Sequence, residues 1–306
     1  MDKSGFVKMK HLITDIQRFS LNDGPGIRTT VFFKGCNMRC TWCHNPETLS
    51  GEADLMFYGT KCIGCGKCFA VCPNGAHKLV DGRHIIDRSL CNKCGKCADL
   101  CYAQALVISG KEMTVAQIMD EVRQDKAYYE ASGGGITLSG GEVLCHVDFA
   151  VELAKACHAE GISVAIETNL SMPYNHIRPL LDEVDVIMAD CKLFDDDMHR
   201  KYTGISNRTV LENIRAIEKI PMIVRTPLIP GVTATPENLR AIATELSKKK
   251  NLVYYQLLNF NPLGSTKYQS LDARNDFATE RPYTPDEMNA FGAMLSDIPV
   301  SVKVGE

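Results

Sequence analysis

Eleven of the fourteen cysteines in this 306-residue chain fall into three tightly spaced runs, and this spacing limits the fold more than any other feature. The first run is Cys36-x3-Cys40-x2-Cys43. The other two runs share the pattern C-x2-C-x2-C-x3-C and begin at Cys62 and Cys91. This repeated pattern is typical of two-cluster ferredoxins, in which the fourth cysteine of each run ligates the cluster that the other run binds. The spacing therefore predicts three [4Fe-4S] clusters.

Crossed ligation assigns four cysteines to each of two auxiliary clusters. Auxiliary cluster 1 takes Cys62, Cys65, Cys68 and Cys101, and auxiliary cluster 2 takes Cys91, Cys94, Cys97 and Cys72. The first run has three thiols and no local fourth. A cluster held in this way keeps one iron open, and an open coordination position distinguishes a reactive metal site from a closed structural one. We therefore expect a reactive cluster at Cys36, Cys40 and Cys43.

Two alternatives remain for the first run. The three thiols also suit zinc, and a fourth thiolate from Cys145, Cys157 or Cys191 would close a cluster. In the segment DVIMADCK, strand alternation places Cys191 opposite the face of Asp190, on the side that packs against helices. Cys145 and Cys157 suit buried apolar positions. An open iron is the reading that the pattern favours.

Composition narrows the class of protein. The net charge of −3 provides no basic surface for phosphates, so we expect no nucleic-acid partner. The chain has no apolar run of membrane-spanning length, and its first twenty residues lack the apolar centre of a signal peptide. Metal-ligand spacing in a reducing compartment argues against disulfides. We expect a monomeric cytoplasmic enzyme with no membrane contact.

Short β-branched runs alternate with helical patterns over most of the chain, which favours an α/β fold with a parallel sheet. The expected strands are Ile27–Phe33, Ile136–Ser139, Ser163–Glu167, Asp185–Asp190, Met222–Thr226, Val253–Leu258 and Val300–Val304. Helix starts are indicated at Thr114, Thr235 and Thr284 by a capping box or by a following proline. These features predict a full or partial parallel β/α (TIM-like) barrel, with its chemistry at the carboxyl ends of the strands.

Residues 52–110 interrupt this alternation. Their two halves, KCIGCGKCFAVCPNGA and LCNKCGKCADLCYAQA, are an internal repeat. Each half contributes ligands to both auxiliary clusters, so neither is expected to fold alone. We therefore predict a ferredoxin-like insert at 52–110 within a barrel made of residues 1–51 and 111–306.

The chain resembles the radical S-adenosylmethionine (radical SAM) enzymes, which carry the CxxxCxxC loop, and more narrowly the glycyl radical enzyme activating enzymes. The motifs for the narrower resemblance run in the family's order: DGPGIRTTVFFKGC (23–36), CHNPET (43–48), SGGGITLSGGE (132–142), IETN (166–169), MADCK (188–192) and HRKYTG (199–204). The double insert is similar to that of the longer members, which activate glycyl radical lyases, dehydratases and decarboxylases.

The resemblance implies an activity. An electron from the cluster cleaves SAM to methionine and a 5′-deoxyadenosyl radical, which removes a glycine Cα hydrogen from a large partner, the glycyl radical enzyme. Such a radical must form against its target, so we expect a cavity that excludes water. A flavodoxin or ferredoxin is the implied electron donor, with the auxiliary clusters as a relay; a structural or docking role for the insert is the alternative.

The resemblance also implies SAM contacts. Gly140, Gly141 and Glu142 would hold the amino group of SAM, the glycines because they permit close backbone approach. Arg225 would lie near its carboxylate, where the planar donor fork of arginine is suited to bind, and a structural ion pair is the alternative. Strand alternation points both Arg225 and Glu167 inward.

A second set of implied positions surrounds the same ligand. Glu167, Thr168, Met188 and Asp190 match the positions at which pyruvate formate-lyase activating enzyme holds a monovalent cation, with Glu167 in the place of the family's aspartate. Lys192 is expected beside Asp190 in the active-site lining, with a simple salt bridge as the alternative.

Adenine binding is expected to differ from that in relatives. Asn261 stands where relatives often have histidine, and an amide cannot stack as an imidazole does. We therefore expect adenine contacts to move toward Trp42, the only tryptophan, which is otherwise a core residue.

The DGPG segment completes the implied site. Asp23, Gly24 and Arg28 match the segment that meets the partner's glycine loop, with a plain turn as the alternative. Rival functions are a radical SAM enzyme that acts on a small molecule or peptide, an activator of anaerobic ribonucleotide reductase, and a multi-cluster electron-transfer protein that binds no SAM. The sequence does not indicate which glycyl radical enzyme is the partner.

Overall fold

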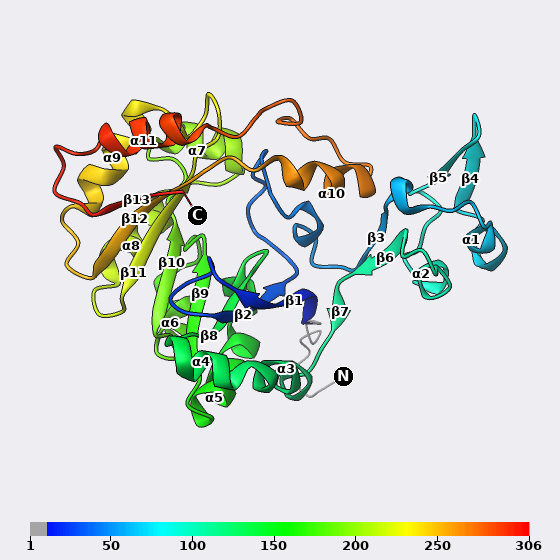
Figure 1. Cartoon of the computed structure of the whole chain (residues 1–306), viewed down its shortest axis with the longest axis horizontal. Helices are drawn as coiled ribbons and strands as arrows, with labels where there is room; N and C mark the ends of the chain where they lie inside the picture. Colours follow the sequence, from blue (N-terminus) through cyan, green and yellow to red (C-terminus); the bar gives the residue numbers. More distant parts are fainter. Residues whose placement is uncertain (1–10, 306) are drawn as a thin grey trace.

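The computed structural model describes residues 11–305, and the first ten residues of the N-terminal segment considered above lie outside them. Seven parallel strands form the main part of one large sheet (Figure 1). In chain order they are β2 (Arg28–Phe33), β8 (Gly135–Gly140), β9 (Ser163–Thr168), β10 (Val186–Asp190), β11 (Met222–Pro227), β12 (Leu252–Leu258) and β13 (Val302–Val304). The predicted parallel α/β architecture is confirmed, and each predicted strand agrees within two residues at either end.

Two antiparallel strands that the sequence pattern does not predict extend this sheet. β1 (Leu12–Ser20) pairs with β2, and β7 (Lys111–Glu112) pairs with β1. β1 carries polar residues such as Thr14 and Gln17 that line the central cavity, and these break the apolar alternation of a half-buried strand. The strand order runs from β13 to β7 without closing, so the barrel is partial.

Helices cover the outer face of the sheet and bury its apolar side chains. They are α3 (Val115–Val122), α4 (Lys126–Ser132), α5 (Val147–Ala159), α6 (Tyr174–Leu181), α8 (Arg208–Ala216), α9 (Pro236–Leu246) and α11 (Pro285–Ala293). Two further helices lie elsewhere: α7 (Asp196–Thr203) packs against the cluster around Trp42, and α10 (Ser265–Ser270) contacts the segment Asp54–Phe57. The predicted caps are confirmed: Thr114, Thr235 and Thr284 each accept a backbone N–H at the start of α3, α9 and α11. Leu153 of α5 and Ile166 of β9 are fully buried in the shared core, where each contributes about 1.5–3 kcal/mol.

The insert (residues 52–110) lies to one side of the large sheet, near α10 (Figure 1). It contains β3 (Asp54–Phe57) paired antiparallel with β6 (Leu106–Ser109), the hairpin β4 (His77–Val80) and β5 (Arg83–Ile86), and the short helices α1 (Lys67–Val71) and α2 (Lys96–Asp99). Leu55, Ala76, Ile86 and Leu106 form an apolar cluster separate from the main core. The insert therefore has its own small centre.

Ion pairs join the insert to the rest of the chain. The fully buried Lys34 pairs with Asp54 at 3.0 Å, and Asp54 also pairs with Lys93 at 2.8 Å. Arg88 pairs with Asp272 at 2.8 Å. Only Gly35 separates Lys34 from Cys36, so this ion pair links the insert directly to the loop of the first cysteine run. Within the described residues, no helix has the length and apolar character needed to cross a membrane.

Candidate active site

The carboxyl ends of the parallel strands surround a cavity of about 670 Å³, a usual size for a small-molecule site. Its walls come from the ends of β8 to β12, from β1 and from the loop after β2. All three cysteines of the first run line this cavity, together with Trp42 between two of them. The active-site end of the sheet is thus the end predicted from parallel-strand topology.

The donor set in the cavity fits a cluster with one open iron. Among the described residues, no fourth cysteine lines the cavity. Cys157 and Cys191 are buried in the core on the helix side of the sheet. Burial raises the pKa of both Cys36 and Cys43 to about 12, so the free thiols keep their protons and metal binding must release them. Three thiolates and no fourth leave room for a non-protein ligand.

The glycines after β8 pack against the loop that carries these cysteines. A Cβ atom on Gly141 would lie 2.3 Å from the carbonyl oxygen of Gly35, and one on Gly140 would lie 2.4 Å from backbone atoms of Phe33. The backbone N–H of Glu142 donates to the Gly35 oxygen at 2.9 Å. The close approach that these glycines permit is therefore made to the chain's own backbone, next to Cys36.

The Glu142 carboxylate is buried and already binds three donors. It accepts hydrogen bonds from the Leu144 N–H at 3.0 Å, the Thr168 hydroxyl at 2.6 Å and the Asn169 N–H at 2.7 Å. Burial raises the pKa of Glu142 to about 7. A carboxylate offers about four acceptor positions, so one remains for a ligand ammonium group.

Arg225 of β11 is buried and anchored by three groups. Its Nε donates to Gln256 Oε1 at 3.1 Å, its Nη2 donates to the Asn22 carbonyl at 2.8 Å, and its Nη1 pairs with Glu167. Burial raises the pKa of Glu167, although the charge of Arg225 opposes this. A guanidinium carries five N–H donors, so two remain after these contacts. The ion pair and a ligand-binding role are therefore compatible.

The expected monovalent-cation position contains two ion pairs. Glu167 is paired with Arg225, and Asp190 is paired with Lys192, so both carboxylates there already face a positive side chain. Burial alone lowers the pKa of Lys192, but the charge of Asp190 and the cysteines raises it above its ordinary value. The expectation of a monovalent cation near Met188 and Asp190 stays a prediction, and we derive no step from one.

Trp42 and Asn261 both line the cavity, in different ways. Trp42 is 9% exposed and packs against Leu193 and Ile229, so it is at once a core residue and a wall of the cavity. The Asn261 side chain accepts the Leu263 N–H at 2.9 Å and begins a short 3-10 turn. Phe260, which the motifs do not single out, adds a second buried aromatic ring to this wall.

Glu47 is a further cavity residue that motif spacing does not select. Its Oε1 accepts from Lys267 Nζ at 2.6 Å, whereas its buried Oε2 has no hydrogen-bond partner among the described residues. Gln256 of β12 is a second such residue. The signal available for Gln256 is a polar side chain in the apolar strand VYYQLL, which marks the inward face.

Comparison with known proteins places the chain in a family. Residues 30–243 match the family model of the Radical SAM superfamily. The chain is 39% identical over 295 residues to the indoleacetate decarboxylase activating enzyme of Tractidigestivibacter scatoligenes, covering 92% of this chain and 93% of that protein. It is 42% identical over 269 residues to the benzylsuccinate synthase activating enzyme of Thauera aromatica, covering 85% and 81%.

The chain belongs to the glycyl radical enzyme activating enzymes of the radical SAM superfamily. A solved structure, QueE from Escherichia coli, matches it with a TM-score of 0.50 at 12% identity, over 98% of this chain and 95% of that one. This likeness concerns the fold alone.

Asp23 is the residue of the DGPG segment of this activating enzyme that lines the cavity. It accepts the Thr30 hydroxyl at 2.6 Å, and Gly24 adopts φ +122° against the Arg28 side chain. Arg28 itself is 1% exposed and donates to Thr137 Oγ1 at 2.7 Å and to the Pro25 carbonyl at 3.1 Å. Arg28 therefore holds the turn from inside, and partner contact at Asp23, Gly24 and Arg28 stays a prediction.

The insert of the activating enzyme contains a second cavity, of about 480 Å³. Its cysteine lining comprises Cys62, Cys65, Cys68, Cys97 and Cys101. Cys101 comes from the second run but faces the cavity of the first, which is the arrangement that crossed ligation requires. The lining thus contains all four cysteines expected for auxiliary cluster 1, together with Cys97, which is expected in auxiliary cluster 2. Cys72 and Cys91 contact the apolar cluster of the insert, and Cys94 is exposed.

Proposed function

We propose that this activating enzyme binds its SAM cluster through Cys36, Cys40 and Cys43 and removes a Cα hydrogen from a glycine loop that a large glycyl radical enzyme inserts into the cavity. The observation that carries this assignment is a cavity with three cysteines, a buried carboxylate and a buried guanidinium on its walls. When bound, the cluster supplies the electron that cleaves SAM to methionine and the 5′-deoxyadenosyl radical.

The residues of the chain bind and orient SAM. Glu142 offers its remaining acceptor position to the ammonium group, and Arg225 offers its two remaining N–H groups to the carboxylate. Trp42 and Phe260 provide aromatic surface for the adenine, which the amide of Asn261 can contact only by hydrogen bonds. These cavity walls would keep a radical that forms on bound SAM close to its target.

The Lys192–Asp190 pair contributes charge at the cluster loop. Burial raises the pKa of the Cys40 thiol, and the positive charge of the almost buried Lys192 opposes this rise. We assign Lys192 the role of stabilising the negatively charged thiolates, so that cluster binding depends on it.

We assign the ferredoxin-like boundaries 52–110 to the insert, with auxiliary cluster 1 on Cys62, Cys65, Cys68 and Cys101 and auxiliary cluster 2 on Cys91, Cys94, Cys97 and Cys72. One observation supports electron entry here. Ile63, Leu79 and Tyr102 are 71%, 67% and 84% exposed around the insert cavity. A carrier protein of the flavodoxin or ferredoxin type would dock on this exposed apolar surface.

The test is radical installation with purified proteins under anaerobic conditions. The chain is reconstituted with iron and sulfide, reduced with dithionite and incubated with SAM and a candidate glycyl radical enzyme; the named relatives make indoleacetate decarboxylase and benzylsuccinate synthase the first choices. We expect a glycyl radical EPR doublet that Cys40→Ser abolishes. Cys145→Ser is the matched control, because Cys145 does not line the cavity.

The same assay separates the alternatives. A relay predicts that Cys65→Ser and Cys94→Ser retain radical formation with dithionite and lose it with flavodoxin. A structural insert predicts loss with both reductants. Radical formation by Cys40→Ser at the wild-type level would refute the assignment, and SAM cleavage that yields a modified small molecule without the large partner would favour the rival radical SAM reading.

A further inference from the structure

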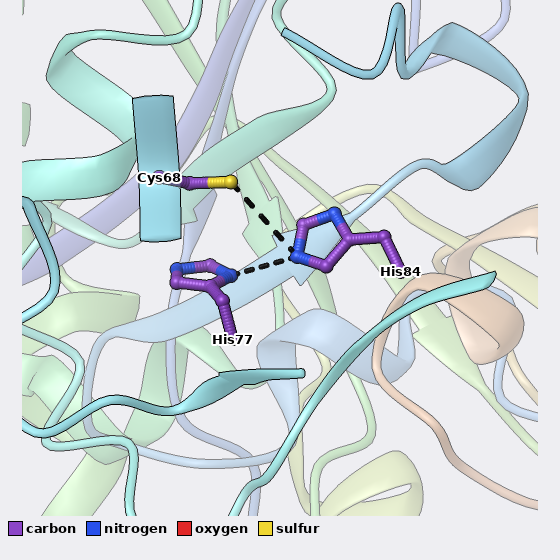
Figure 2. A group of neighbouring side chains, drawn as sticks. All are labelled: Cys68, His77 and His84. Carbon is purple, nitrogen blue, oxygen red and sulfur yellow. Dashed lines mark hydrogen bonds between the residues drawn. The ribbon is translucent and has the colours of Figure 1, made fainter. Parts of the chain in front are cut away.

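Two histidines of the β4–β5 hairpin lie against the cysteines of the insert cavity (Figure 2). His77 Nδ1 is 2.8 Å from His84 Nε2. The Sγ atoms of Cys62 and Cys68 are each 3.9 Å from a nitrogen of His84, the first from Nδ1 and the second from Nε2. The function proposed above uses neither histidine.

The surrounding residues hold the His84 ring in place. Its centroid lies 4.4 Å from the ring of Phe57 and 4.9 Å from that of Phe69. His77 is 5% exposed and its ring lies 5.0 Å from that of His84. In the hairpin register, Leu79 opposes His84 and Ile86 opposes His77. Both imidazoles are therefore positioned by packing on the cavity side of the hairpin.

The hydrogen bond between the two rings determines which nitrogen of His84 can donate a hydrogen bond to a cysteine sulfur. One of the two nitrogens 2.8 Å apart must carry the proton. If His77 Nδ1–H donates to His84 Nε2, the neutral His84 carries its own proton on Nδ1. That N–H then faces Cys62 Sγ. A second group commonly fixes the tautomer of a histidine at a metal centre in this way.

We propose that His84, positioned by His77, donates a hydrogen bond to the Cys62 sulfur of auxiliary cluster 1 and raises the reduction potential of that cluster. This inference rests on the proposed function, because it requires auxiliary cluster 1. Reduction adds negative charge to a cluster, and a donor aimed at its sulfur stabilises the reduced form more than the oxidised one. His84 is thus a positioning and tuning residue rather than a ligand.

The same side chains also resemble a small metal site, since the ligand atoms of Cys68, His77 and His84 all lie within 4.8 Å of one another. A metal site of this kind would need Cys68, which the proposed auxiliary cluster 1 already uses as a ligand. It also requires that the 2.8 Å contact between the imidazoles be broken so that both nitrogens can face a metal ion. Zinc bound with the loss of one cluster is therefore an outcome that would overturn the proposal.

The experiment compares reconstituted full-length holoenzymes of the wild type, His84→Phe, His77→Phe and the control His176→Phe. Phenylalanine keeps a packed ring in place of His84 and removes both nitrogens, whereas His176 is exposed on α6. Cys62→Ser identifies which EPR signal belongs to auxiliary cluster 1. EPR-monitored redox titration then reports the midpoint potential, and pulsed EPR of ¹⁵N-histidine-labelled protein reports nitrogen coupling to the reduced cluster.

We expect His84→Phe to lower the ratio of reduced to oxidised auxiliary cluster 1 about threefold at a fixed potential, about 30 mV for a one-electron couple. The nitrogen coupling should vanish, iron content should stay at the wild-type level, and His77→Phe should give a smaller shift. An unchanged potential with retained coupling would refute the tuning role alone. Full iron content and an unchanged EPR spectrum in Cys62→Ser would instead show that auxiliary cluster 1 is not bound by these cysteines. That result would refute both the proposed cluster and the tuning role of His84.

Discussion

Replacing Gly141 with alanine tests whether the glycine pair of the GGE motif serves SAM directly or holds the cluster loop. The new Cβ atom would lie 2.3 Å from the Gly35 carbonyl oxygen, 2.7 Å from its carbonyl carbon and 2.9 Å from the Thr48 carbonyl oxygen. All three are backbone atoms, so no side-chain rotation relieves the contact. Since ordinary contact begins at 3.4 Å, the loop must move by about 1 Å.

That displacement has a calculable effect. Overpacking of this kind destabilises by about 1–3 kcal/mol. The bonds from Glu142 N to Gly35 O at 2.9 Å and from Gly35 N to Thr48 O at 2.7 Å would stretch, at about 0.5–1.5 kcal/mol each. We therefore expect about 2–6 kcal/mol of destabilisation. Because metal–ligand distances tolerate only about 0.2 Å, the movement of the neighbouring Cys36 should also lower cluster occupancy.

Iron content, the EPR signal of the reduced SAM cluster and the urea unfolding midpoint of Gly141→Ala are the measurements. Gly51→Ala is the matched control, because it lies in the same region, has no left-handed backbone conformation and would place its Cβ in open space. Loss of iron and stability in Gly141→Ala alone is the expected result. Wild-type iron and stability combined with weaker SAM binding would show that the glycine serves the ligand and that the packing argument is wrong.

Three further substitutions test the buried polar groups. Burial raises the pKa of Glu142 from 4.5 to about 7, so the folded chain binds more protons than the unfolded chain between these pH values. The free energy of unfolding should therefore fall by about 3 kcal/mol between pH 5 and pH 8. Glu142→Gln should lack this pH dependence. Arg225→Lys keeps the charge but can replace only part of the fork to Glu167 and Gln256, so we expect about 1–3 kcal/mol of destabilisation and weaker SAM binding by calorimetry. Arg28→Gln should lower the free energy of unfolding by about 3–5 kcal/mol, while the folded fraction keeps its affinity for the partner. Weaker partner binding without loss of stability would show that Arg28 contacts the partner.

Cysteine spacing and strand periodicity determine much of the fold and site without coordinates. The seven parallel strands and the caps at Thr114, Thr235 and Thr284 follow from local patterns, since apolar periodicity and capping chemistry depend on neighbouring residues. Alternation along one strand likewise predicted that Met188 and Asp190 share the cavity face and that Cys191 lies opposite. The sequence pattern did not predict β1, because its polar residues face a polar cavity.

Only the tertiary structure decided which polar groups already have partners. Arg28 is enclosed, and Glu167 and Asp190 are each paired with a basic residue from this chain. The arrangement of His84 with Cys62 also depends on a hairpin packing against a loop 16 or more residues away. Spacing along a chain specifies what a local segment can ligate. Burial and pairing arise when distant segments meet, because desolvation and hydrogen-bond satisfaction depend on everything that surrounds a group.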